Sequence, residues 1–161
     1  FQWLNRIRLD RLDQLEAEAS PDVPTIEDVV DVLLLPILNP FPDRPEESAR
    51  HRQFFSRVYS ESPQFQKSIR IKGFSETTDR LLKLLRRALP HLSDEDIYWR
   101  LHFSAGPLVG TLTHGNRLRV ISNGLCDPDD IDDALQRLRG FICAGLEAAS
   151  FSSTDRVPQP T

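Results

Sequence analysis

The side chains with the most versatile chemistry, four histidines and two cysteines, are not spaced as a catalytic or metal site would require. The histidines are His51, His91, His102 and His114. None belongs to the Glu-x-x-His pattern that binds metals in di-iron helical bundles. Acidic residues follow Cys126, which disfavours a reactive thiolate. The sequence also contains no Gly-rich phosphate loop and no G-x-S-x-G elbow. We therefore expect no catalytic residue, metal or cofactor, and a protein that is not an enzyme.

Aromatic side chains in the middle of the chain predict a site for a small apolar ligand, because such pockets are lined mostly by apolar groups with a few polar ones. His102 is the best polar candidate, since it lies one helical turn from Trp99 and Gly106. The predicted ligand contacts are Phe54, Phe55, Val58, Phe74, Leu81, Trp99, His102, Phe103 and Gly106. Ordinary core positions for the aromatic residues, and a core hydrogen bond for His102, are the alternative.

Length and composition set the broad class. The chain has 161 residues, 39% hydrophobic and 27% charged, as in a single globular domain. A net charge of −4 argues against nucleic acid as the partner of this segment. The start at Phe1 and the lack of methionine predict a piece of a longer protein. Two cysteines, no apolar run long enough to span a membrane and no signal peptide predict a cytoplasmic protein without a membrane partner.

Hydrophobic periodicity and turn residues predict an all-α fold of about six helices. The helices should cover about 2–19, 25–38, 45–59, 63–89, 94–113 and 128–149. Thr25 and Ser93 each precede an aspartate by three residues, as in a capping box. Asp127 is the predicted N-cap of the last helix, with Pro128 as its first residue. Residues 1–149 should form one domain, and 150–161 a disordered tail.

The predicted helix over 94–113 is apolar or small around nearly its whole circumference. Such a helix must be covered on almost all sides. It is either the central helix of the domain, or a helix covered by its own domain on one face and by another subunit on the other.

The last predicted helix has one apolar face and, beside it, a row of small residues at Gly140, Ala144 and Ala148. A glycine inside a helix costs about 1 kcal/mol relative to alanine. Close approach of a second helix backbone would compensate for that cost at Gly106, Gly110, Gly140 and Gly145. The alternative is that these glycines only relieve crowding within a monomer.

The order of these elements resembles the C-terminal domain of TetR-family transcriptional regulators. The residues that carry the resemblance are 99–103, Gly106, 108–112 and 124–130, ahead of a final amphipathic helix. The resemblance covers residues 5 to about 149. It implies a homodimer in which the last two long helices of each subunit form a four-helix bundle, and a small-molecule effector bound in each subunit. The predicted dimer contacts are Leu108, Leu112, Leu135, Leu138, Phe141, Ile142, Gly145 and Leu146.

The resemblance also implies that DNA is bound only through an N-terminal helix-turn-helix domain, which is missing from this sequence. Arg6, Arg8 and Arg11 could face that domain or DNA phosphates. We instead expect them to form a solvated face balanced by acidic neighbours, namely Asp10, Asp13 and Glu16.

Two functions follow from these expectations. The first is the ligand-sensing and dimerisation domain of a TetR-like transcriptional regulator, a repressor released from or retuned on DNA by a small hydrophobic ligand. The second is a standalone helical interaction module with no small-molecule ligand, in which the all-apolar helix is simply the core.

Overall fold

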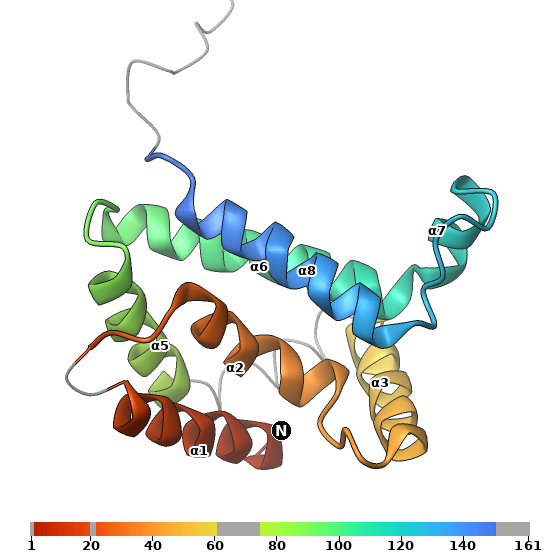
Figure 1. Cartoon of the computed structure of the whole chain (residues 1–161), viewed down its shortest axis with the longest axis horizontal. Helices are drawn as coiled ribbons and strands as arrows, with labels where there is room; N and C mark the ends of the chain where they lie inside the picture. The colour runs from red at the N-terminus through yellow and green to blue at the C-terminus, as the bar shows by residue number, and fades with distance from the viewer. Residues whose placement is uncertain (1, 20–21, 61–74, 151–161) are drawn as a thin grey trace, which may run out of the picture.

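The computed structural model describes residues 2–19, 22–60 and 75–150, and within these ranges every regular element is a helix (Figure 1). The helices are α1 (Gln2–Glu18), α2 (Ile26–Leu38), α3 (Pro45–Ser60), α5 (Ser75–Ala88), α6 (Asp94–Thr113), α7 (Gly115–Ile121) and α8 (Ile131–Glu147). The all-α prediction is confirmed. None of the helices in the described ranges is long and apolar enough to cross a membrane.

The sequence reasoning missed α7, which makes the number of described helices seven rather than about six. His114 ends α6 and also precedes the first residue of α7, with no side-chain capping bond. Seven residues give two turns, which is too short for a periodic apolar pattern to stand out.

The central helix of the domain is α2. It packs against α1, α3, α5 and α8, and lies between the α6–α8 pair and α1 (Figure 1). Its buried residues are Ile26, Val29, Val30, Val32, Leu34, Pro36, Ile37 and Leu38. A helix with buried apolar residues on most of its circumference is stable only when covered on most sides. The central place that the sequence left open for the 94–113 helix is therefore taken by α2.

Two helix starts agree with the sequence prediction. Thr25 Oγ1 accepts the N–H of Asp28 at 3.2 Å, and the carboxylate of Asp28 accepts the N–H of Thr25 at 3.2 Å, which completes a capping box. Ser93 Oγ accepts the N–H of Asp96 at 3.1 Å and caps α6. The carboxylate of Asp96 accepts the Ser93 hydroxyl at 2.8 Å and not the Ser93 backbone N–H, so only half of the predicted capping box forms here.

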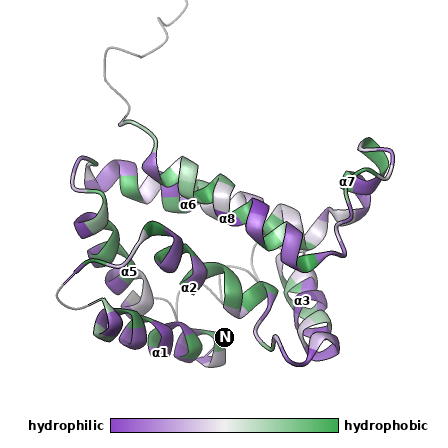
Figure 2. Ribbon diagram, viewed as in Figure 1, coloured by the Kyte–Doolittle hydropathy of each residue, from purple (hydrophilic) through white to green (hydrophobic). Residues whose placement is uncertain are grey.

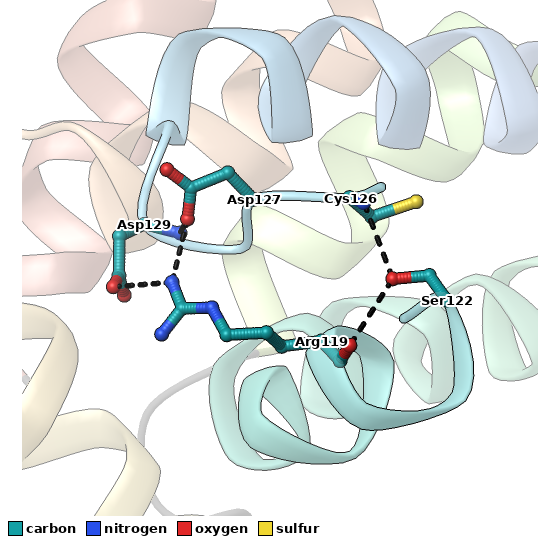
Figure 3. Close-up of polar contacts among 5 residues, drawn as sticks. All are labelled: Arg119, Ser122, Cys126, Asp127 and Asp129. Carbon is teal, nitrogen blue, oxygen red and sulfur yellow. Dashed lines mark hydrogen bonds and ion pairs between the residues drawn. The ribbon is translucent and has the colours of Figure 1, made fainter. Parts of the chain in front are cut away.

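The predicted N-cap of the last helix at Asp127 is wrong, because α8 begins three residues later than predicted. Asp130 is its N-cap and accepts the N–H of Asp133 at 3.1 Å. Asp127 instead accepts the N–H of Asp129 at 3.1 Å and an Arg119 N–H at 2.6 Å (Figure 3). Its carboxylate therefore closes the turn before the helix, and Asp130 is left to cap the first helical turn.

Three predictions fall on residues outside the described ranges. These are the start of the fourth predicted helix at Pro63, the ligand contact at Phe74 and the disordered tail beyond Ser150. The described part of that fourth helix is α5.

The expected solvated face on α1 is wrong for Arg8, which is buried. Arg8 shares the inner side of the helix with Leu4 and Leu12, at four-residue spacing, and its Nη2 donates to the carbonyl oxygen of Leu33 at 3.0 Å. Burial lowers the pKa of this guanidinium to about 10. Helix periodicity placed Arg8 on the core side whatever its charge.

The acidic residues of α1 pair with a different helix from the one expected. Arg80 of α5 contacts Asp13 at 2.8 Å and Glu16 at 3.0 Å. These contacts join α1 to α5 near the protein surface. The expectation that Asp13 and Glu16 balance the arginines of their own helix is therefore wrong.

Candidate functional site

Helix α6 has one covered and one uncovered face. Ile97 and Leu108 point into the core and are almost fully buried. On the opposite side, the Trp99 and Phe103 side chains are 52% and 62% exposed, and their rings stack with centroids 5.5 Å apart. Of the two arrangements left open for this helix, the structure has the one in which its own domain covers a single face.

The predicted dimer contacts divide in the same way. Five of them are buried within the chain itself: Leu108, Leu135, Leu138, Ile142 and Leu146. Leu112 is half-buried. Phe141, which is 67% exposed, and Gly145 remain available on the outer side of α8. Side chains already covered by the core are not free to touch a partner, so any interface on this layer must use the outward residues.

The glycines of α6 and α8 are not explained by crowding inside the chain. A Cβ atom added at Gly106, Gly110, Gly140 or Gly145 would meet nothing within 4 Å. Alanine would therefore fit at each position and would stabilise the helix by about 1 kcal/mol. The alternative that these glycines relieve intramolecular crowding does not fit the structure.

The predicted ligand contacts also separate into inner and outer groups. Phe55 and Val58 are buried on α3 and Leu81 is buried on α5, and these two helices pack against opposite ends of α2 (Figure 1). Phe54, on α3, is 54% exposed. The four α6 residues Trp99, His102, Phe103 and Gly106 lie on the uncovered face instead. A ligand role for either group stays a prediction, but the two groups do not form one site within the described part of the chain.

The sequence analysis did not single out His51, which stands at the centre of an aromatic cluster. Its ring centroid lies 4.9 Å from that of Trp3 and 4.8 Å from that of Phe55. Its Nε2 donates to the carbonyl oxygen of Pro36 at 3.0 Å when that nitrogen carries the hydrogen. Desolvation lowers the pKa of His51, against the opposing effect of the Pro36 bond, so the neutral ring is favoured.

The end of α2 explains why a histidine is held there. The Pro36 carbonyl would normally accept the N–H of residue 40, but that residue is Pro40, which has none. Arg52 donates to the carbonyl oxygen of Leu38 at 2.8 Å and caps the same helix end. Pro36 and Pro40 were the signal in the sequence for the His51 contact, because a proline at position 40 leaves the Pro36 carbonyl without its usual N–H donor.

A groove of about 560 Å³ opens beside the outer face of α6 and α8, where α7 stands away from them. The C-terminal half of α6 contributes Gly110 and Thr111, α7 contributes Leu118, and α8 contributes Arg137 and Phe141. A second hollow, of about 680 Å³, lies at the other end of α6 beside Trp99 and is flanked by acidic residues, Asp94 and Glu95.

Polar contacts hold the chain in place between α7 and α8 (Figure 3). Arg119 binds Asp127 and Asp129 at 2.6 and 2.8 Å. The Ser122 hydroxyl accepts the N–H of Cys126 at 3.2 Å and donates to the Arg119 carbonyl oxygen at 3.3 Å. These bonds hold α7 at a defined angle to the α6–α8 pair. No group of three metal-ligating side chains occurs in the residues that the structure describes.

Comparison with known proteins identifies the family to which the chain belongs. Residues 31–145 match the family described as tetracyclin repressor-like, C-terminal domain. No match was found among curated proteins or solved structures. The matched region begins within α2 and ends within α8, so it contains most of the central helix and nearly all of the α6–α8 layer. The helical architecture and a match over most of the chain show that this protein belongs to the TetR family, as a tetracyclin repressor-like C-terminal domain.

Proposed function

We propose that the chain is the ligand-sensing and dimerisation domain of a transcriptional repressor. A small hydrophobic compound bound to this domain releases the repressor from DNA or changes how it binds DNA. DNA is contacted by a separate N-terminal domain and not by this segment, whose net charge is −4. The cytoplasmic location expected from the sequence fits a regulator that must reach DNA.

The outer face of α6 and α8 is the feature that supports the proposed dimerisation. This face combines exposed aromatic rings at Trp99, Phe103 and Phe141 with glycines that nothing in the chain requires. Large exposed apolar patches mark interaction sites in soluble proteins. Glycine on a helix face permits the close approach of a second helix. Both features support a symmetric contact between two copies of this layer.

The mass of the protein in solution tests the proposed dimerisation directly. We expect a mass of twice the 18.4 kDa of one chain at micromolar concentration. Phe141→Asp places a carboxylate in the proposed interface and should give monomers, whereas Phe54→Asp, at a similarly exposed position on α3, should leave the dimer intact. A native chain that stays monomeric would favour the standalone interaction module instead.

The proposed ligand binding rests on the apolar interior, to which α3 contributes Phe55 and Val58 and α5 contributes Leu81. An apolar interior with few charges suits a fatty acid, an acyl thioester or a hydrophobic drug-like molecule. A compound at 100 times its dissociation constant should stabilise the domain by about 2.7 kcal/mol in a thermal-shift assay. A response to sugars or metal ions, with none to these hydrophobic compounds, would contradict this assignment.

A further inference from the structure

We propose that two copies pack their α6 helices antiparallel, crossing at Gly106, and that the Trp99–Phe103 pair of each copy fills the groove beneath α7 of the other. This inference rests on the dimerisation proposed above and adds its register and its anchor residues.

The spacing of the outer face supports this register. Trp99, Phe103, Gly106 and Gly110 follow one another at three- or four-residue intervals and so form one stripe along α6. The bulky residues lie on the N-terminal side of Gly106. The groove beside Gly110 lies on its C-terminal side. In an antiparallel pair that crosses at Gly106, a residue several positions before the crossing in one copy meets a residue equally far after it in the other.

This pairing brings the large side chains to the hollow. Phe103, three positions before Gly106, faces Val109 of the other copy, next to Gly110. Trp99, seven positions before the crossing, faces Thr113. At 1.5 Å of rise per residue these contacts lie about 4.5 and 10 Å from the crossing point. Both therefore fall along the part of α6 that borders the groove.

The distribution of charges along the α6–α8 layer favours this antiparallel arrangement over a parallel one. Asp94 and Glu95 flank the Trp99 end of α6, whereas Arg117 and Arg137 flank the groove. Within the chain Asp94 already pairs with Arg86 and Arg137 with Asp133, so Glu95 at one end of α6 and Arg117 on α7 beside the groove are the charges that a second copy would meet. An antiparallel pair therefore brings acidic residues to basic ones. A parallel pair would place each charged group against its own like-charged copy, which is unfavourable.

The position of α7 identifies the second copy as the occupant. Helix α7 projects from one end of the α6–α8 pair, on the side opposite α1, α2 and α3 (Figure 1). It extends beyond the outer face where a partner would lie. Apolar segments are exposed at the far end of this projection (Figure 2), where Val120, Ile121 and Leu125 are at least 68% exposed. These side chains would flank a helix pair seated on the outer face and lose their contact with water.

The dimer dissociation constant of the 161-residue chain, measured by analytical ultracentrifugation, tests the anchor. Phe103→Ala should raise this constant at least about thirtyfold, as expected for a central aromatic anchor. Phe54→Ala removes a similarly exposed ring from α3 and should leave it unchanged. An equal effect of the two substitutions would overturn the proposal.

A charge reversal tests the register. Glu95→Arg and Arg117→Glu should each weaken the dimer about threefold or more, and the double variant should restore it. If Phe141→Asp dissociates the dimer while the double variant is weaker than either single one, the antiparallel register is wrong and the dimerisation function stands. If the native chain is monomeric, both proposals fail.

Tryptophan emission gives a readout that does not depend on the interface variants folding. Trp3 and Trp99 are the two tryptophans of the chain, so Trp3→Phe leaves Trp99 as the reporter. Its emission should shift to longer wavelength when the dimer is diluted into monomers, since Trp99 is half exposed in the single chain. An emission maximum that stays constant across dissociation would overturn the seating of Trp99 in the groove.

Discussion

Arg100 of α6 caps the C-terminal end of α8, and its removal should loosen the layer that carries the proposed interface. One guanidinium nitrogen donates to the carbonyl oxygens of Leu146 and Ala148, each at 2.6 Å, and the other donates to that of Ala149 at 2.8 Å. A further contact, to the Gly145 oxygen at 3.4 Å, is too long to count as a strong bond. The last carbonyls of a helix have no partner within the helix, so Arg100 supplies one from a neighbouring element.

The expected magnitude follows from where these oxygens lie. The bond to Leu146 is partly buried, and a hydrogen bond to a charged group is worth about 1.5 kcal/mol or more. The other two bonds are exposed, so water can replace them. Loss of a cation at the negative end of the helix dipole adds up to about 1 kcal/mol. Arg100→Met should therefore lower the free energy of unfolding by about 2 kcal/mol and the Tm by about 6 °C.

The assay is urea denaturation at one fixed protein concentration, because the stability of a dimer depends on concentration. Arg100→Lys should recover about half of the loss, since a lysine keeps the charge but lacks the planar fork. Arg50→Met, at an exposed position of α3, serves as the matched control and should change stability by less than about 0.5 kcal/mol. Amide exchange should also accelerate in the last turn of α8. Equal stability of Arg100→Met and Arg50→Met, with unchanged exchange there, would refute the capping role.

Three further predictions concern other parts of the fold. The pKa of His51 is lowered on folding, so the unfolded chain takes up more protons as the pH falls through about 6.5, and stability should be full above that pH and decline below it. His51→Gln should flatten the unfolding free energy between pH 7.5 and 5.5, and an unchanged slope would contradict this. Asp31 and Arg139 join α2 to α8 through two contacts of 2.7 Å, and a double-mutant cycle with Asp31→Asn and Arg139→Met should give a coupling of about 1–2 kcal/mol; additive effects would rule that out. Burial raises the pKa of Cys143 to about 11, so iodoacetamide at pH 8 should modify half-buried Cys126 well before Cys143 by mass spectrometry, and equal rates would contradict the burial of Cys143.

The positions of the helices followed largely from local rules. Thr25 with Asp28 marked the start of α2, and Pro40 marked its end, because caps and proline act on the backbone within a few residues. The same rules misplaced the start of α8. Three aspartates lie close together there, and the contact that Arg119 makes with two of them decides which is left to cap the helix.

The candidate site was less predictable, because it depends on the directions in which side chains point. Trp99 and Phe103 were predicted as ligand contacts beside Phe55 and Val58, but they lie on the outer face of α6, away from the buried residues of that set. Leu135 and Ile142 were expected at the dimer contact, yet they pack inside the chain. A helix that is apolar on nearly all sides has no periodic signal to show which side faces its own domain.

The sequence by itself determined that this protein is helical, where most helices begin and end, and that α6 and α8 carry more apolar and small residues than one covered face needs. Those properties depend on residues a few positions apart. Only the tertiary structure decided that α2 is the central helix, that Arg8 and His51 satisfy carbonyls of α2, and which face of the α6–α8 layer stays uncovered. These features depend on contacts between residues far apart in the chain, where the packing of whole helices, and not local spacing, selects the partner.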